Sequence, residues 1–204
     1  MNARRSPLDV VLIDGGGSNI ASVQAAFARR GVNAELSRDH ERIGRASHVV
    51  LPGVGAAAPA MQRLRALGLD RLIPTLTQPL LGVCLGMQLL FTSSEESNTA
   101  CLGLIPGRVQ RLLEADCGRV PHIGWNQLQA LTDAPLLAGL EAAAYAYFVH
   151  SYVAPVGPAT VATCDYGGAF SAVVSWRNFH GVQFHPERSA AVGARILANF
   201  LELA

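Results

Sequence analysis

The sequence predicts an α/β fold with a doubly wound, mostly parallel sheet, helices on both of its faces and a β-rich mixed extension. Before residue 95, short apolar runs alternate four times with stretches of helical periodicity, which is typical of βαβ units with right-handed crossovers. Between residues 104 and 176, short β-rich runs broken by Gly and Pro take over, which indicates mixed or antiparallel pairing. With 204 residues, the chain has the length of one domain, residues 1–204, with a substantial core.

Composition and charge argue against several classes of function. The chain has 16 Lys and Arg residues against 15 Asp and Glu residues, so no nucleic-acid partner is expected. No apolar run approaches the roughly 18 residues of a membrane span. The apolar segment that follows Arg4 and Arg5, residues 10–13, is too short for an export signal. The four cysteines have no Cys-x-x-Cys spacing, so neither zinc nor a disulfide framework is indicated. We expect a cytoplasmic protein.

The first predicted unit is a buried parallel strand at residues 10–13, followed by a Gly-rich turn and a helix at residues 20–30. The turn does not match a dinucleotide-binding Gly-x-Gly-x-x-Gly motif, because the third glycine would fall at Ile20. The same reasoning gives the later elements. Strands are predicted at residues 33–36, 48–51, 145–149, 161–164 and 172–176, helices at 56–67, 69–76 and 190–203, and a polar loop at 92–97.

Cys84 lies where an apolar strand pattern gives way to an apolar helix pattern. So sharp a turn requires residues without a Cβ beside the nucleophile, and Gly82 and Gly86 meet that requirement. At the start of a helix, unpaired backbone N–H groups favour a thiolate and can also bind an oxyanion. The segment therefore indicates a nucleophile elbow, although a free cysteine packed in a hydrophobic run is the alternative.

A second cluster, His185-Pro186-Glu187, follows a short apolar strand and precedes a helix. A thiol hydrolase needs a base and a group that orients the base. Pro186 turns the chain, so the Glu187 carboxylate can fold back onto one nitrogen of His185 and leave the other facing Cys84. For a single histidine, a helix cap without chemistry is the alternative, but beside the elbow the catalytic interpretation is favoured.

These motifs, residues 82–88 (GVCLGMQ) and 185–187 (HPE), resemble those of the class I (triad) glutamine amidotransferases. More narrowly, residues 52–55 (PGVG), 121–126 (PHIGWN) and 147–152 (YFVHSY) are similar to the glutaminase subunits of imidazole glycerol phosphate synthase, an enzyme of histidine biosynthesis. The resemblance runs from about residue 10 to residue 200.

The resemblance implies that a Cys84–His185–Glu187 triad hydrolyses the side-chain amide of L-glutamine with no metal or organic cofactor. The ammonia would pass to a (β/α)8-barrel synthase subunit in a heterodimer. The backbone N–H groups of Val54 and Leu85 would bind the oxyanion. The resemblance also implies a set of glutamine-binding residues: Gly53, Gln88, Glu96, Ser151 and Tyr152.

It further implies a surface for the barrel subunit, formed by Asn19, Pro121, Trp125 and Tyr147. A Trp125 buried in the chain's own core is the alternative. In the turn that precedes Asn19, Gly15 and Ser18 stand where relatives often carry other residues.

Three other functions compete with this interpretation. A glutaminase of another synthase, such as those of aminodeoxychorismate, anthranilate or guanylate synthesis, is opposed by Gly124-Trp125-Asn126 and by residues 52–55. A γ-glutamyl hydrolase would act without a partner. A scaffold without activity is opposed by the presence of all three triad residues.

Overall fold

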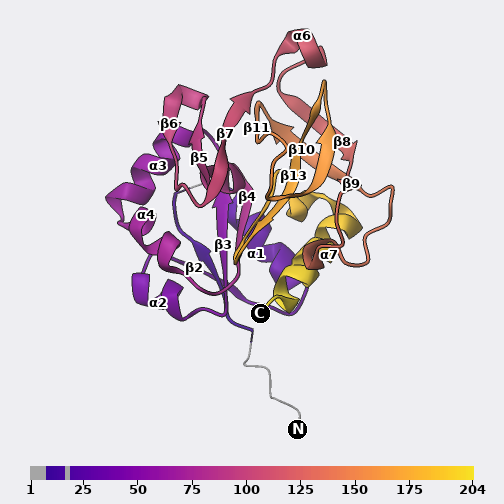
Figure 1. The fold of residues 1–204 in the computed structure, drawn as a ribbon. Coiled ribbons are helices and arrows are strands. Elements are labelled where there is room, and N and C mark those ends of the chain that lie inside the picture. The colour runs from indigo at the N-terminus through magenta and orange to yellow at the C-terminus, as the bar shows by residue number, and fades with distance from the viewer. Residues whose placement is uncertain (1–7, 17–18) are drawn as a thin grey trace.

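An eight-stranded sheet forms the centre of the protein in a computed structural model that describes residues 8–16 and 19–204 (Figure 1). Its strands, in spatial order, are β2 (Ala34–Ser37), β1 (Val10–Ile13), β3 (His48–Gly53), β4 (Leu80–Cys84), β14 (Phe179–Val182), β13 (Ala169–Trp176), β12 (Thr160–Asp165) and β9 (Gln129–Ala130). The first five are parallel to one another, and the last three continue the sheet in antiparallel pairing. The predicted mostly parallel α/β fold is confirmed.

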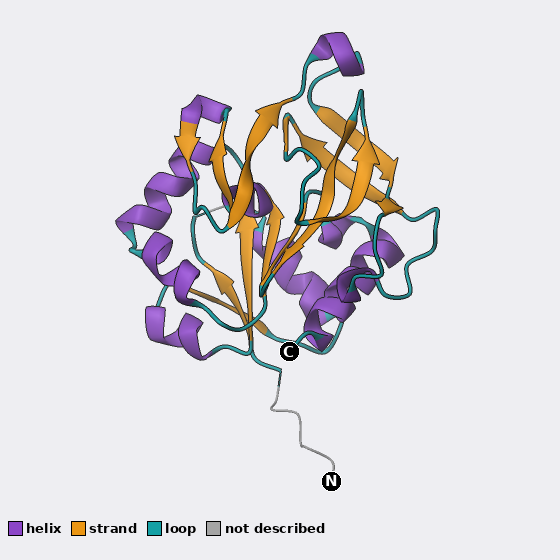
Figure 2. Cartoon of the chain, viewed as in Figure 1, coloured by secondary structure: helices purple, strands orange, loops and turns teal. Residues whose placement is uncertain are grey.

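Helices cover both faces of this sheet (Figure 2). Alternate residues of β1 face opposite sides, so Val10 and Leu12 join one core cluster while Val11 and Ile13 join the other. The first cluster includes buried side chains of α1 (Ile20–Ala28) and α7 (Ala190–Glu202). The second includes those of α2 (His40–Arg45), α3 (Ala57–Ala66), α4 (Leu69–Leu72) and α5 (Leu85–Leu89). A four-residue apolar strand is therefore buried on both sides, as its sequence predicts.

Two smaller sheets lie outside the main one, and both include strands of the β-rich extension, so the extension is more divided than the sequence predicts. One contains β11 (Tyr152–Val153), β7 (Ile105–Arg111), β5 (Phe91–Ser94) and β6 (Thr99–Ala100). The other is a ribbon of β8 (His122–Gln127) and β10 (Tyr145–His150). The short helical segments that remain are α6 (Glu114–Cys117) and 3-10 turns at Ile73–Thr75, Glu96–Asn98, Pro135–Leu137 and Pro186–Arg188.

Two predicted elements are corrected by the structure. Residues 92–94 of the predicted polar loop belong to β5, because pairing with β6 and β7 satisfies their backbone. The predicted helix at 69–76 ends at Leu72 and continues as a 3-10 turn. Pro74 accounts for that ending, since it has no backbone N–H to donate to the preceding turn. None of the helices in the described ranges combines the length and apolarity needed to cross a bilayer.

The connection from β4 to α5 is as tight as the elbow motif predicts. Cys84 has φ 53° and ψ −112°, a backbone conformation that side chains disfavour. A Cβ added to Gly82 would lie 2.7 Å from the carbonyl oxygen of Gly86. A Cβ added to Gly86 would lie 1.9 Å from the carbonyl oxygen of Leu51 in β3. The structure thus confirms the steric reason for both glycines.

We expect Gly86→Ala to lower the free energy of unfolding by about 2 kcal/mol or more, because the new methyl group would overlap the backbone of β3. Denaturant unfolding monitored by circular dichroism measures this change. Gly44→Ala is the matched control, since Gly44 lies in α2 and a methyl group added there would meet no atom within 4 Å. That variant should gain about 0.5 to 1 kcal/mol from helix propensity. Equal stability of the two variants would contradict the elbow packing described above.

Candidate active site

A cavity of about 350 Å³ opens at the carboxyl ends of β3 and β4, where ligand sites of open parallel sheets lie. It brings together nine of the residues singled out in the sequence. These are Val54, Cys84, Leu85, Gln88, Glu96, Pro121, Ser151, Tyr152 and His185. Gly55, Val149 and His150 complete its lining. The segments that meet here are far apart in the chain, and they come from the main sheet and from both smaller sheets.

The three predicted triad residues are in contact. His185 Nδ1 lies 2.9 Å from Glu187 Oε1. The side chains of Cys84 and His185 line the same cavity, and their attraction contributes to the raised pKa of His185. Pro186 starts a 3-10 turn that folds the Glu187 carboxylate back onto the imidazole. The side chains of His185 and Glu187 are both almost completely buried.

Opposing electrostatic effects decide the charges of this pair. Burial opposes protonation of His185, but hydrogen bonds to Cys84 and Glu187 outweigh it and raise the pKa of His185 to about 10. Burial also opposes ionisation of Glu187, but its hydrogen bond and charge attraction to His185 lower the pKa of Glu187 below its usual range. The arrangement favours an imidazolium held against a carboxylate at neutral pH.

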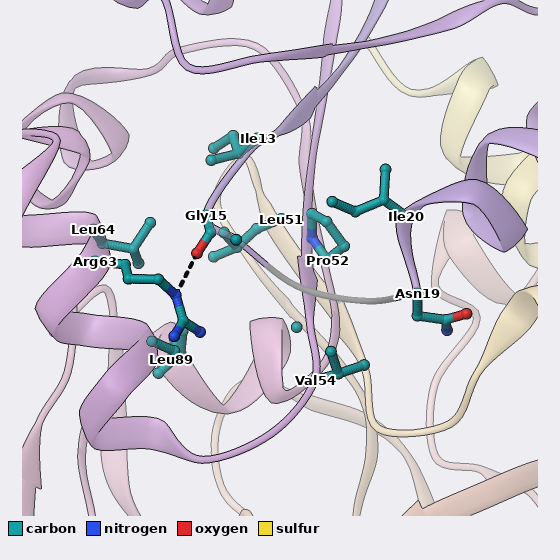
Figure 3. A pocket seen from close by; sticks show the side chains of 13 residues that line it. Ile13, Gly15, Asn19, Ile20, Leu51, Pro52, Val54, Arg63, Leu64 and Leu89 are labelled. Carbon is teal, nitrogen blue, oxygen red and sulfur yellow. Dashed lines mark hydrogen bonds between the residues drawn. The ribbon is translucent and has the colours of Figure 1, made fainter.

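Asn19 is a fourth member of this group that sequence reasoning assigned elsewhere. It precedes α1, and its Nδ2 lies 2.5 Å from Glu187 Oε1 and 3.5 Å from His185 Nδ1. Asn19 also lines a smaller neighbouring cavity, together with Ile13 and Leu51 (Figure 3). Its donation contributes to the lowered pKa of Glu187. The predicted order of strands could have indicated this position, because Asn19 follows the first parallel strand and Cys84 ends another, and the carboxyl ends of parallel strands lie at the same edge of the sheet.

The predicted glutamine-binding residues have structural partners of their own. Glu96 Oε2 accepts a hydrogen bond of 2.7 Å from the backbone N–H of Ala57, the first residue of α3. Gln88 Nε2 donates to the Tyr152 carbonyl and to Gln183 Oε1, each at 2.9 Å. Gly53 differs from the others because it does not line the cavity. A Cβ there would lie 2.2 Å from the backbone nitrogen of Gly86, so Gly53 packs against the elbow.

A smaller cavity lies behind the predicted oxyanion segment. It measures about 30 Å³ and is lined mainly by apolar side chains from β1, β3 and α3, with Arg63 Nε donating to the Gly15 carbonyl at 2.7 Å (Figure 3). That volume holds about one water molecule, so the cavity is too small for glutamine. Ser18, in the same turn as Gly15, lies outside the described residues.

The four residues predicted to meet a partner come from different parts of the chain. Trp125 is 53% exposed, so the alternative of a core tryptophan is wrong. It pairs with Tyr147 across β8 and β10, and the two rings meet edge to face with centroids 5.9 Å apart. The Arg188 guanidinium carbon lies 4.7 Å from the centre of the Tyr147 ring. Pro121 and Asn19, by contrast, lie at the catalytic cavity and the triad.

In the described part of the chain, no three His, Cys, Asp or Glu side chains are grouped so as to hold a metal ion. The described chemistry is that of a buried cysteine beside a histidine and a glutamate. The family model described as Glutamine amidotransferase class-I matches residues 11–204. The chain belongs to this family.

Two relatives within the class I glutamine amidotransferases match over almost their whole length. One, from Xanthomonas axonopodis pv. citri (strain 306), is 57% identical over 195 residues, which cover 96% of this chain and 98% of that protein. The other, from Xylella fastidiosa (strain 9a5c), is 53% identical with the same coverage. Both are named imidazole glycerol phosphate synthase subunit HisH.

Crystal structures agree on the fold of this amidotransferase. A protein from Thermoplasma acidophilum, described as a putative GMP synthase subunit, superposes with a TM-score of 0.74 at 18% identity, covering 97% of this chain and 94% of that one. A structure described as a glutamine amidotransferase gives a TM-score of 0.73 at 20% identity, with coverage of 95% and 97%. At these identities the likeness shows the fold alone.

Proposed function

We propose that this class I amidotransferase is the glutaminase subunit of an imidazole glycerol phosphate synthase and that it supplies ammonia for histidine biosynthesis. The observation that carries the proposal is the contact of Cys84 with the His185–Glu187 pair at the floor of a cavity large enough for an amino acid. The relatives that are 53% and 57% identical and are named as this subunit support the choice among amidotransferases.

Cys84 is the proposed nucleophile. Its thiolate attacks the side-chain amide carbon of L-glutamine, and the backbone N–H groups of Val54 and Leu85 bind the resulting oxyanion. His185 in its imidazolium form donates a proton to the leaving nitrogen, which departs as ammonia and leaves a glutamyl thioester on Cys84. The raised pKa of His185 supports this role, because the proton donor must be charged before the amide breaks.

A water molecule then completes the cycle. His185, neutral after giving up its proton, takes a proton from the water as it attacks the thioester carbon. Collapse of the second tetrahedral intermediate releases glutamate and restores the thiolate and imidazolium. Glu187 holds the imidazole in orientation and stabilises its charged form throughout. No step of this cycle requires a metal or an organic cofactor.

Polar groups around the cavity would hold the rest of the glutamine. The Glu96 carboxylate suits the α-ammonium group, since only one of its oxygens is used by Ala57. Gln88 and the backbone of Ser151 and Tyr152 line the same wall and offer further hydrogen bonds. Gly53 would act through its backbone, because its position against the elbow leaves no room for a side chain.

The proposed partner is a (β/α)8-barrel synthase subunit that forms a heterodimer with this chain and receives its ammonia. Trp125 is exposed and meets the half-buried ring of Tyr147 edge to face, and this pair is a suitable anchor because aromatic side chains are enriched at binding hot spots. Pro121 lines the cavity and Asn19 contacts Glu187, so a partner that meets these two residues would act directly on the site. Glycines on both sides of Val54 allow its N–H to be set in place when the partner binds.

Cys84→Ala is expected to lower glutamine-dependent synthase activity at least about 10³-fold, because the group that forms the thioester is lost. The assembled synthase should still run on added ammonium salts. The measurement is synthase turnover with each nitrogen source, and Cys117→Ala is the control, since that cysteine lies in α6 outside the cavity. Glutamine turnover within tenfold of wild type would remove Cys84 from its proposed role.

Trp125→Ala is expected to raise the Kd for the barrel subunit by at least about tenfold through loss of a buried aromatic anchor. It should also reduce the stimulation of glutaminase turnover by the barrel subunit and its nucleotide ligand, which we expect to be about tenfold or more. Isothermal titration and ammonia release measure the two effects. Leu131→Ala removes an equally exposed apolar side chain, 53% accessible, outside the ribbon. An equal loss of affinity in both variants, or full activity without the partner, would contradict the proposal.

A further inference from the structure

Gln183 occupies a position beside the nucleophile that the mechanism above does not use. Register pairs Val182 of β14 with Val83 of β4, so the next residues of the two strands, Gln183 and Cys84, emerge side by side. The Gln183 side chain is completely buried, and its Nε2 lies 3.8 Å from Cys84 Sγ, within hydrogen-bonding distance for sulfur. A buried amide needs partners for its donor and its acceptor, and one of those partners is the reacting atom.

The Tyr152 carbonyl determines which end of the Gln183 side-chain amide faces Cys84, because Gln88 links the two by hydrogen bonds. The Tyr152 carbonyl can only accept, so the Gln88 amide atom 2.9 Å from it must be Nε2. The same nitrogen lies 2.9 Å from one amide atom of Gln183, which must therefore be the acceptor Oε1. The remaining atom of Gln183 is then the nitrogen, so an N–H donor is directed at Cys84 Sγ.

Two buried histidines hold the carbonyl that sets this direction. His150 Nδ1 lies 3.0 Å from the Tyr152 oxygen, and His122 Nδ1 lies 3.1 Å from His150 Nε2. Burial lowers the pKa of His150 to about 3 and that of His122 to about 4, so both rings are neutral at physiological pH. Since His150 donates to a carbonyl, its Nε2 must accept from His122, whose own Nε2 lies 3.3 Å from Asn126 Nδ2. All the hydrogen bonds of this chain run toward Tyr152.

We propose that Gln183 is a further catalytic residue, whose fixed amide N–H stabilises the thiolate of Cys84 and the sulfur as the thioester is cleaved. The inference rests on the proposed function in taking Cys84 as the nucleophile. The Val149 carbonyl, 3.8 Å from Sγ on another side, can only accept and therefore favours the thiol. His185 donates to the sulfur while charged but must give up its proton to the leaving nitrogen. Gln183 is the neutral donor that stays in place during that transfer.

The test is the pH dependence of Cys84 alkylation by iodoacetamide, followed by mass spectrometry of the peptide that contains Cys84. Gln183→Met keeps the length of the side chain and removes its N–H, so the midpoint of alkylation should rise by at least about 0.5 pH unit. Gln183→Glu keeps the acceptor that Gln88 requires and places an oxygen toward the sulfur, so its midpoint should rise at least as far. The other titratable groups that line the cavity are Glu96, His150, Tyr152 and His185, and they are identical in all variants.

Asn199→Leu is the matched control, because Asn199 is a buried amide that donates to the carbonyls of Leu136 and Ala138. It should lose stability without any shift of the alkylation midpoint. An unchanged midpoint in both Gln183 variants, or an equal shift in Asn199→Leu, would overturn the inference.

A second measurement does not depend on the folding of a Gln183 variant. In the wild-type protein, the ¹⁵N resonance of the Gln183 side-chain amide should follow the ionisation of Cys84, and this titration should vanish in Cys84→Ala. An amide signal that is identical in the two proteins at all pH values would also overturn the inference. Neither experiment requires glutamine turnover. Failure of the proposed function would instead appear as full glutaminase activity of Cys84→Ala, so the two failures can be told apart.

Discussion

The close approach of two backbones at the elbow is the constraint on which the site depends. Where β4 ends and α5 begins, Gly86 lies so near the Leu51 carbonyl that even a methyl group would overlap it. This contact keeps α5 against β3 and holds Cys84 in its unfavourable backbone conformation. The same packing aligns Gly53 with Cys84 across the two strands, so the proposed oxyanion segment leaves the sheet next to the thiol.

Around this fixed point, buried polar groups replace the water that the charged His185 and Glu187 side chains would otherwise need. Glu187 Oε1 supports His185, and Asn19 supports Glu187 at the same oxygen. Burial by itself would neutralise both ionisable groups. Interactions with Cys84 and Glu187 reverse that tendency for the pKa of His185, and the interaction with His185 reverses it for the pKa of Glu187. The catalytic groups are thus held by interactions that a solvent-exposed triad would lack.

Local patterns predicted most of the fold and of the site. Apolar runs gave the parallel strands, because strands buried on both faces read as uninterrupted hydrophobic stretches. The elbow could be predicted because its tight turn leaves no room for a side chain at two positions of fixed spacing, and glycine occupies both. Ser94 was misjudged as part of a loop, because a small polar side chain in a strand is indistinguishable from a loop residue until its neighbouring strands are known. Pro74 is a residue that interrupts helices, and the predicted helix at 69–76 was wrong because it continued through this proline.

The parts of the site that could not be predicted from the sequence depend on contacts between segments that are far apart in the chain. Asn19 reaches Glu187 across 168 positions of the chain, and Gln88 reaches Gln183 across 95. Neither pair has any periodicity or local motif, and both arise from the order of strands in the sheet. The resemblance to glutamine amidotransferases supplied roles for Gln88 and Glu96, but the partners that hold each side chain became known only from the structure.

The central claim is that Cys84 carries the glutamyl group during glutamine hydrolysis. Its most direct test is to mix the enzyme and the proposed barrel subunit with isotopically labelled L-glutamine, quench with acid within one turnover, and analyse the peptides by mass spectrometry. The mechanism predicts a labelled glutamyl thioester on the peptide that contains Cys84. Turnover of glutamine with no adduct on that peptide, or with the adduct on another residue, would contradict it.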